Sequence, residues 1–381
     1  MSTRSHHKTP PDPTATRPTR PSPAPPRTAV RIASGLRRFF LRAADRMLPT
    51  PLAVAEHAHH VAAAHILSAI AELGIADELC AAPRSARELA ASLHCDPDAV
   101  HRLLRAGATF DFVRLDRHGR FHPTRATRVL RSDHPSATAD WCRNVTGQAQ
   151  QAAWAELAGS VRTGDGAFRR VHGMSLFEWF DAHPDEGTHF SAGLGGLTLA
   201  EAPAIIAGYP FPKQGTVCDI AGGRGVLLAE ILKSRPALSG VLVESPDVLE
   251  QAREYLHHQG VADRVELVAG DIFDGLHATA DLYVLKWILH DWDDAACQKI
   301  LGNVANAMPA GARLLTIEGE QDRTRVHPRF SMIDLVMLVL TEGGRERSRD
   351  QLSQLVSSSG LTPGPVRRSA TDLLLLEAGK T

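Results

Sequence analysis

Residues 282–294, LYVLKWILHDWDD, combine an apolar run with side chains that can move protons. The run predicts a buried strand, and it is followed by one imidazole, His290, and by three carboxylates, Asp291, Asp293 and Asp294. Neutral imidazole accepts a proton near neutral pH, so His290 is a candidate general base. The alternative is a buried histidine that caps the next helix. The three aspartates are suited to cap that helix and to complement its dipole.

A second stretch, VCDIAGGRG at 217–225, joins a predicted strand to small residues that let a ligand approach the backbone at a helix N-terminus. Asp219 precedes this loop and is placed to orient it or a ligand's amino group. The next predicted strand ends at Glu244, whose carboxylate can accept hydrogen bonds from two ribose hydroxyls. After the third strand, Asp271 would lie near a bound base. The small residues of the loop are Ala221, Gly222, Gly223 and Gly225.

Two cofactors suit such a loop. A nicotinamide dinucleotide needs G-x-G-x-x-G/A, and counting from Gly223 the third position is Leu228, so this pattern fails. S-adenosylmethionine has no pyrophosphate and needs only the loop, an acid for its ribose and contacts for its adenine. A glycine turn in a ligand-free domain would leave Glu244 and Asp271 unexplained. The sequence therefore favours S-adenosylmethionine.

Short β-branched runs must position these side chains. They alternate with helical or loop segments, which predicts a parallel, doubly wound α/β sheet covered by helices on both faces, over residues 213–381. In such sheets ligands bind outside the carboxyl ends of the strands. The last two runs, around a turn at 369–372, predict a closing antiparallel hairpin. The five parallel runs are 216–220, 240–244, 264–269, 281–286 and 313–318.

The N-terminal half is predicted to be helical. Within residues 29–135, a helix ending at Gly74, a capping box of Ser85 with Glu88, and a hairpin turning at 118–119 form a winged-helix pattern. Residues 136–212 are predicted to be a helical segment that links the domains and contributes to a substrate pocket. Its aromatic side chains can line a pocket for an aromatic ligand or can be plain core. Those of interest are Phe177, Trp179, Phe180 and Phe190.

The bulk composition excludes several classes of protein. Over 381 residues, 42 Lys and Arg nearly cancel 43 Asp and Glu, which argues against coating nucleic acid or membranes. The five cysteines are scattered and form no C-x-x-C pair, so free thiols in a reducing cytoplasm are expected. His57 and His60 lie at i, i+3 without an obvious further ligand, so no metal site is expected. No apolar run approaches the ~18 residues of a membrane helix.

The first residues differ from the rest of the chain. Residues 1–28 are rich in Pro and Arg and are predicted to be disordered. The Arg-rich stretch 31–48 can form an amphipathic helix. We interpret it as a lead-in that packs on the first domain, with a membrane-surface or transit helix as the alternative.

Five motifs in this order, DIAGGRG, GDIF, LKWILHDWDD, IEGE and GGRERS, resemble the S-adenosylmethionine-dependent small-molecule O-methyltransferases over about residues 50–378. The resemblance implies that His290 is the base, flanked by Glu318 and Glu346, which are expected to hydrogen-bond the imidazole. It also implies a homodimer formed through the winged-helix domain. The implied cofactor contacts are Asp219, Ala221, Gly222, Gly223, Glu244, Asp271, Ile272 and Lys286. The implied substrate contacts are Phe177, Trp179, Phe190, Leu194, Ile333, Met337 and Thr341.

Four positions depart from the family pattern. Ala221 replaces a usual glycine and Glu244 a usual aspartate, while Thr341 replaces an asparagine and Leu194 a methionine. The last two leave the acceptor open. The expected activity is methylation of a phenolic hydroxyl on a small aromatic secondary metabolite. Alternatives are a hydroxylase, decarboxylase or N-methyltransferase on the same fold.

A ligand-sensing winged-helix regulator is a further alternative, from a different class of protein. It would need a basic recognition helix. The candidate helix carries Arg102 and Arg105, but it begins with Asp96 and Asp98, where a nucleic acid would approach. The regulator therefore ranks below the enzyme.

Overall fold

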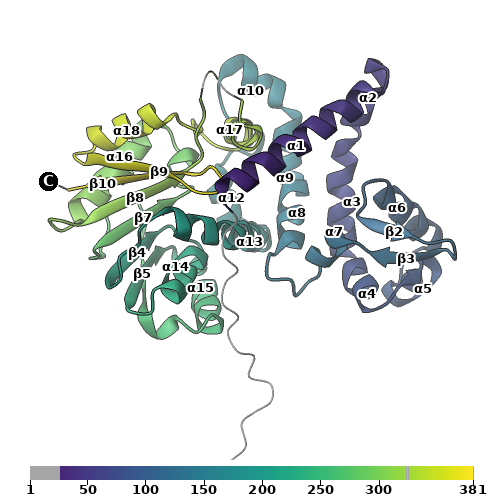
Figure 1. Ribbon diagram of the computed structural model, residues 1–381, viewed down its shortest axis with the longest axis horizontal. Helices are drawn as coiled ribbons and strands as arrows, with labels where there is room; N and C mark the ends of the chain where they lie inside the picture. The colour runs from purple at the N-terminus through teal and green to yellow at the C-terminus, as the bar shows by residue number, and fades with distance from the viewer. Residues whose placement is uncertain (1–25, 323, 325, 381) are drawn as a thin grey trace, which may run out of the picture.

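The computed structural model describes residues 26–322, 324 and 326–380. A winged-helix domain and a sheet domain lie at opposite ends, joined by long central helices (Figure 1). The predicted disordered tail, 1–28, lies outside the described residues except for its last three. Helix α1 (Arg27–Arg46) already begins there.

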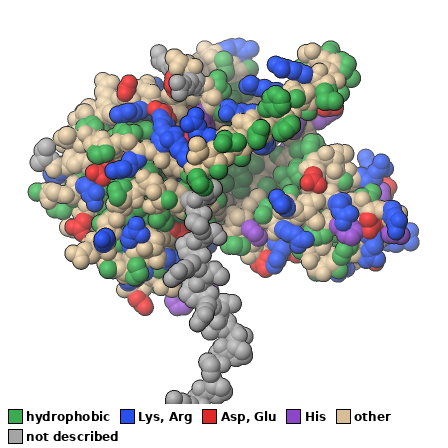
Figure 2. Space-filling model, viewed as in Figure 1, with side chains coloured by type: hydrophobic (Ala, Val, Ile, Leu, Met, Phe, Trp, Pro, Cys, Tyr) green, Lys and Arg blue, Asp and Glu red, His purple; other side chains and the backbone are tan. Residues whose placement is uncertain are grey.

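Helix α1 is amphipathic, as predicted, but its packing differs from the expectation. In the part of the chain that the structure describes, no α1 residue is buried, and Arg27 pairs with Asp372 of the sheet domain at 2.9 Å. Its other end contacts α2 of the winged-helix domain, where Asp45 lies 3.5 Å from His57, so the helix reaches both domains. Figure 2 shows apolar side chains along this helix. Its exposed large apolar residues are Ile32, Leu36, Phe39, Phe40 and Leu41.

The winged-helix pattern is confirmed. The glycine at position 74 adopts φ +71 between two helices, Ser85 and Glu88 form both bonds of the capping box, and Gly119 turns the wing with φ +74. The small sheet has the order β1-β3-β2. The elements are α2 (Thr50–Ala58), α3 (His60–Glu72), α4 (Ile75–Ala81), β1 (Arg84–Ser85), α5 (Ala86–Leu93), α6 (Pro97–Thr109), β2 (Val113–Leu115), β3 (Arg120–Pro123) and α7 (Arg125–Val129).

The linking segment is helical, and its last helix crosses the centre of the molecule (Figure 1). That helix, α13, touches α8 through glycines, because a Cβ atom at Gly193 would meet Trp141 and one at Gly196 would meet the Ser136 carbonyl. The helices are α8 (Thr138–Thr146), α9 (Gln148–Ala155), α10 (Leu157–Thr163), α11 (Ala167–His172), α12 (Leu176–Ala182) and α13 (Pro184–Gly208).

The expectation that no segment is long and apolar enough to cross a membrane is wrong by length and composition. Among the described residues α13 is such a helix, and α2–α3 with α4 is a second if this bent pair counts as one span. Helix α13 packs against α8 and α14, and 33% of its most apolar window is buried. Length and composition alone are weak evidence for a membrane span, because the core helix of a soluble protein passes the same test.

The sheet domain confirms the doubly wound prediction. Its order is β6-β5-β4-β7-β8-β10-β9, with β10 antiparallel to β8 and β9, so the predicted hairpin closes the sheet. The strands are β4 (Gly215–Ile220), β5 (Leu238–Glu244), β6 (Val265–Ala269), β7 (Leu282–Lys286), β8 (Arg313–Glu318), β9 (Thr362–Arg368) and β10 (Leu374–Gly379). The helices are α14 (Val226–Ser234), α15 (Pro246–His258), α16 (Asp294–Ala307), α17 (Pro328–Leu340) and α18 (Arg349–Ser358).

Two apolar clusters cover the two faces of this sheet. Alternation along each strand divides the side chains between them; on β4, for example, Val217 joins one cluster and Cys218 the other. The cluster that contains Val217 lies against α13, α14 and α15. The cluster that contains Cys218 lies against α16 and α18. The strands are therefore fixed from both sides, and the loops at their carboxyl ends are held in place.

Candidate active site

The turn after β7 carries His290. Its ring is 11% exposed, its Nδ1 lies 2.9 Å from Glu346 Oε1, and its Nε2 lies 3.4 Å from Asp291 Oδ1. The chain leaves the strand abruptly because Trp287 adopts φ +56, in the left-handed region. The position of His290 is therefore fixed by strand β7, which ends four residues before it.

Glu318, at the end of β8, occupies a different place from the one the resemblance implied. Its Oε1 accepts the backbone N–H groups of Ile288 (3.3 Å) and Leu289 (2.9 Å), while Oε2 has no partner among the described residues. Burial raises the pKa of Glu318 to about 7. Of the two implied glutamates, only Glu346 hydrogen-bonds the imidazole, so the expected contact of Glu318 with the ring is wrong. Glu318 holds the turn that carries the ring.

Glu346 comes from the GGRERS motif, between α17 and α18. Its side chain is fully buried, and its backbone N–H donates to Asp334 Oδ1 at 2.9 Å. Burial, with a contribution from the charge of Asp334, raises the pKa of Glu346 to about 8. Glu346 is therefore a buried hydrogen-bond partner of the ring, 2.9 Å from its Nδ1.

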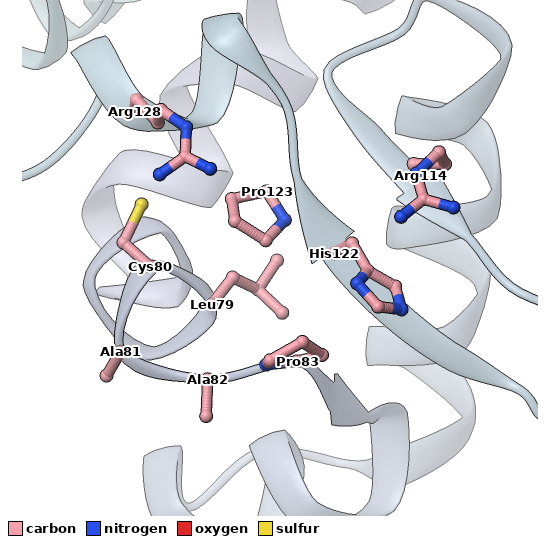
Figure 3. A pocket seen from close by; sticks show the side chains of 9 residues that line it. All are labelled: Leu79, Cys80, Ala81, Ala82, Pro83, Arg114, His122, Pro123 and Arg128. Carbon is pink, nitrogen blue, oxygen red and sulfur yellow. The ribbon is translucent and has the colours of Figure 1, made fainter.

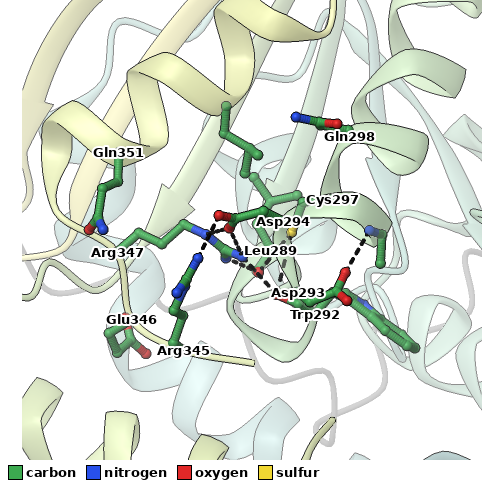
Figure 4. A network of polar contacts seen from close by, with 12 residues as sticks. Leu289, Trp292, Asp293, Asp294, Cys297, Gln298, Arg345, Glu346, Arg347 and Gln351 are labelled. Carbon is green, nitrogen blue, oxygen red and sulfur yellow. Dashed lines mark hydrogen bonds and ion pairs between the residues drawn. The ribbon is translucent and has the colours of Figure 1, made fainter. Parts of the chain in front are cut away.

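The three aspartates after His290 have separate roles. Asp293 caps α16 by accepting the Ala296 N–H at 2.8 Å, as expected for these residues. Asp294 instead pairs with Arg345 and Arg347 (Figure 4). Asp291 is not a cap: it lies beside His290 Nε2, and burial raises its pKa to about 6.

The glycine loop after β4 has the geometry of a ligand cradle. Ala221, Gly223 and Gly225 adopt φ +51, +58 and +74, and Gly222 has no room for a Cβ atom because the Asp219 carboxylate lies against it. Asp219 is 2% exposed, and burial raises its pKa to about 7. Within the described chain, its Oδ2 has no hydrogen-bond partner. An orphaned buried acceptor beside a tight loop fits the amino group of S-adenosylmethionine.

The other predicted cofactor acids lie at neighbouring strand ends. Glu244 accepts the Gly223 N–H at 3.1 Å and the Ser245 N–H at 2.7 Å, which fixes the carboxylate while leaving lone pairs for ribose hydroxyls. Asp271 is exposed and accepts the Phe273 N–H at 2.8 Å, next to the half-buried Ile272. These positions agree with a cofactor lying across the carboxyl ends of β4, β5 and β6.

Lys286 makes protein contacts that the sequence analysis missed. Its Nζ lies 3.0 Å from Glu201 and 3.0 Å from Thr198 Oγ1, both on α13. Burial lowers the pKa of Lys286, and Glu201 opposes that effect. Trp287 Nε1 also donates to Glu201 at 3.3 Å, and Arg329 forms an ion pair with the same Glu201 carboxylate. A single acid, Glu201, in the apolar stretch 187–208 was the available signal. Lys286 therefore ties α13 to the sheet.

The predicted substrate residues separate into two groups. Phe177 stacks on Trp292 at 5.6 Å and meets Phe190 edge-on at 6.3 Å, so these rings lie together beside the His290 turn. Trp179 stacks instead on His183 at 3.8 Å and faces another side of α12 from Phe177, because residues two apart on a helix do not face each other.

The remaining predicted substrate residues lie on α13 and α17. The Thr341 hydroxyl donates to the Met337 carbonyl at 2.8 Å, so it serves the end of α17. Leu194 is 38% exposed, Met337 is buried and Ile333 is half-buried. Trp292, in the KWILHDW motif, was not among the predicted substrate residues, although it stacks on Phe177.

Cavity size does not identify the site. A cavity of about 290 Å³ lies in the winged-helix domain, between Leu79, Cys80, His122 and Arg128 (Figure 3). It is remote from the acid–base residues. Only about 10 Å³ is open beside His290, Glu318 and Glu346. The site at the sheet edge is identified by its acid–base side chains and its glycine loop, and not by the size of its cavity.

Comparison with known proteins agrees with this geometry. Residues 154–362 match the O-methyltransferase domain, and residues 55–133 match the O-methyltransferase dimerisation domain, which supports a homodimer. The O-demethylpuromycin-O-methyltransferase of Streptomyces alboniger is 38% identical over 82% of this chain and 85% of its own length. The aclacinomycin 10-hydroxylase RdmB of Streptomyces purpurascens is 32% identical over 81% and 83%.

A solved structure gives the same result for the cofactor. CalO1, a methyltransferase of calicheamicin biosynthesis in its S-adenosylhomocysteine-bound form, is 32% identical, with a TM-score of 0.73 over 87% of this chain and 98% of that one. The glycine loop, the orphaned Asp219 oxygen and the matched domains agree on one conclusion. The chain belongs to the S-adenosylmethionine-dependent O-methyltransferase family, with a dimerisation domain followed by a methyltransferase domain.

Proposed function

We propose that the enzyme methylates a phenolic hydroxyl of a small aromatic acceptor, with His290 as general base. The observation that carries the proposal is the 2.9 Å contact between His290 Nδ1 and Glu346. With the shared proton on Nδ1, the ring donates to Glu346 and presents Nε2 as the free base. The ring is also held at a sheet edge beside the glycine loop.

The base matters because a phenol titrates near ~10 and histidine near ~6.5, while the phenolate is the better nucleophile. Bound S-adenosylmethionine supplies an electrophilic methyl group. Nε2 of His290 takes the acceptor proton, and Glu346 stabilises the imidazolium that forms. Asp291, 3.4 Å from Nε2, adds a second favourable charge. Glu318 acts indirectly by fixing the turn through its two backbone bonds.

The aromatic class of the acceptor is supported by the ring cluster and by relatives. Phe177 and Trp292 stack beside the His290 turn, which suits a flat ring. A 38% identical relative is named for the methylation of O-demethylpuromycin. The balanced charge of the chain favours a small molecule over nucleic acid or a membrane surface as its partner.

The test is incubation with labelled S-adenosylmethionine and a panel of hydroxylated aromatics, read by mass spectrometry. We expect a methylated product with S-adenosylhomocysteine in equal amount. His290→Ala should lower turnover by roughly 10²–10⁴-fold, with a smaller loss on nitrophenols, which ionise without help. Near-normal turnover of His290→Ala on an ordinary phenol would remove His290 from the mechanism.

A second candidate is a hydroxylase that retains the cofactor. It is favoured by one observation, the 32% identity to the aclacinomycin 10-hydroxylase. The same assay, run in air with an added thiol reductant, separates the two. A hydroxylase takes one oxygen atom from dioxygen, the reductant supplies the electrons that turn the other into water, and no stoichiometric S-adenosylhomocysteine is released. With anilines added to the panel, an N-methyltransferase would methylate them and leave phenols unchanged.

A further inference from the structure

Three consecutive residues bond the turn that carries His290. The Arg345 N–H donates to the His290 carbonyl at 2.8 Å, and Glu346 contacts the ring itself. The Arg347 guanidinium donates from Nη1 to the carbonyl of Leu289 and from Nη2 to that of Trp292, the latter at 2.7 Å (Figure 4). These two carbonyls bracket His290 in the chain, one residue before it and two after it.

The guanidinium is itself held firmly. The Arg347 side chain is 4% exposed, and its Nε and Nη2 donate to Asp294 Oδ1 at 2.9 and 2.8 Å. A buried cation is stable only with such a partner. Because Asp294 is the first residue of α16, the pair also joins the 345–347 loop to that helix.

We propose that Arg347 is a positioning residue that clamps the 289–292 turn, so that the His290 ring meets Glu346 and its Nε2 faces the acceptor. The inference rests on the proposed role of His290 as base. A planar guanidinium can serve two carbonyls and a carboxylate at once, whereas a lysine ammonium offers a single charge centre. If the clamp is removed, the buried Leu289 carbonyl and the part-buried Trp292 carbonyl lose their charged donor. Among the side chains that the structure describes, the weak thiol donor Cys297 still contacts both.

Arg345 offers a matched control two residues away. Its side chain is 48% exposed and pairs with the same Asp294, but with the other oxygen. Its contact with the His290 turn is made by the backbone N–H, which a side-chain substitution leaves in place. Arg345→Met therefore removes an arginine from Asp294 without removing a donor from the turn.

The experiment compares Arg347→Met, Arg347→Lys and Arg345→Met as full-length enzymes. Turnover is measured on acceptors of different phenol pKa, and the affinity for S-adenosylhomocysteine by calorimetry. For Arg347→Met we expect turnover on an ordinary phenol to fall by up to about 100-fold, because a small misplacement of a reacting group costs this much. The loss should shrink on nitrophenols, and cofactor affinity should be kept. Arg347→Lys should lie between Arg347→Met and wild type, and Arg345→Met within about twofold of wild type.

A double variant separates positioning from general destabilisation. In the His290→Ala background, Arg347→Met should add almost nothing if it acts through the imidazole. An equal loss on every acceptor, or a loss that multiplies with that of His290→Ala, would overturn the proposal. If Arg347→Met fails to fold, Arg347→Lys and the same double-variant comparison decide. Unimpaired His290→Ala would instead overturn the proposed base, and the clamp with it.

Discussion

At the scale of single residues, the site depends on carboxylates whose surroundings set their chemistry. Glu244 accepts two backbone N–H groups and Asp219 keeps an unpartnered oxygen, although both are acids at the ends of neighbouring parallel strands. The first is thereby fixed for hydroxyl groups, and the second is left for a donor on the ligand. This difference comes from hydrogen bonding and not from residue type.

The role of Glu244 gives a prediction for cofactor affinity. Glu244→Ala should weaken S-adenosylhomocysteine binding by about 1–3 kcal/mol, because charge-assisted bonds to the ribose are lost. Calorimetry measures this directly. Glu244→Gln keeps an acceptor for the loop N–H and should lose less. Unchanged affinity in Glu244→Ala would exclude the residue from the cofactor site.

Glu318 gives a prediction for stability against pH. Its pKa is raised from 4.5 to about 7 by burial, so the folded state holds the proton more tightly than the unfolded state does. The contribution of Glu318 to the free energy of unfolding is therefore full below pH 4.5 and is lost as the pH rises to about 7. Glu318→Gln does not titrate, so its stability relative to wild type should increase between pH 5 and pH 8, by up to about 3 kcal/mol.

Urea unfolding of both proteins at the two pH values measures this difference. The pH dependence of all other groups cancels in the comparison, provided that they are unaffected by the substitution. A difference between the two proteins that is the same at pH 5 and pH 8 would show that Glu318 is ionised in the folded state throughout.

At the scale of elements, α13 joins the linking segment to the sheet domain. Its glycines let it touch α8, and its Glu201 holds Lys286 and Trp287 at the start of the His290 turn. The same helix therefore makes the close backbone contact with α8 and the ion pair with Lys286.

Gly196→Ala tests this junction. A Cβ atom there would meet the Ser136 carbonyl, so we expect a loss of about 1–3 kcal/mol from overpacking and a lower melting temperature. Gly302→Ala is the control: it lies within α16 with nothing within 4 Å of its Cβ position. That substitution should stabilise by roughly 0.5–1 kcal/mol, since alanine favours a helix over glycine. Equal effects would show that α13 can move away from α8.

At the scale of the whole molecule, the dimerisation domain supports a dimer, and the first residues differ in composition from everything that follows. Residues 1–25 are rich in Pro and Arg. A chain beginning at residue 26 keeps Arg27, which pairs with Asp372. We expect this deletion to leave melting temperature, turnover and sedimentation as a dimer nearly unchanged, because such a segment buries little apolar surface. A fall of many degrees would contradict this expectation.

The sequence by itself determined the strands, the winged helix and the motif that carries His290. Each of these is a local property. A β-branched run, a capping box and a glycine turn each depend only on residues close together in the sequence. The family resemblance then assigned the pairing of His290 with Glu346, and the structure places those two residues in contact.

Only the tertiary structure decided which side chains meet. Glu346 is 56 residues from His290, and Glu201 is 86 residues from Trp287, so no periodicity relates them. Packing of α13 and of the 345–347 loop against the strand ends chose these partners. The same packing placed the Glu318 side chain against the backbone of the turn instead of against the ring. Because Glu318 ends β8, its side chain reaches the neighbouring Ile288 and Leu289 N–H groups.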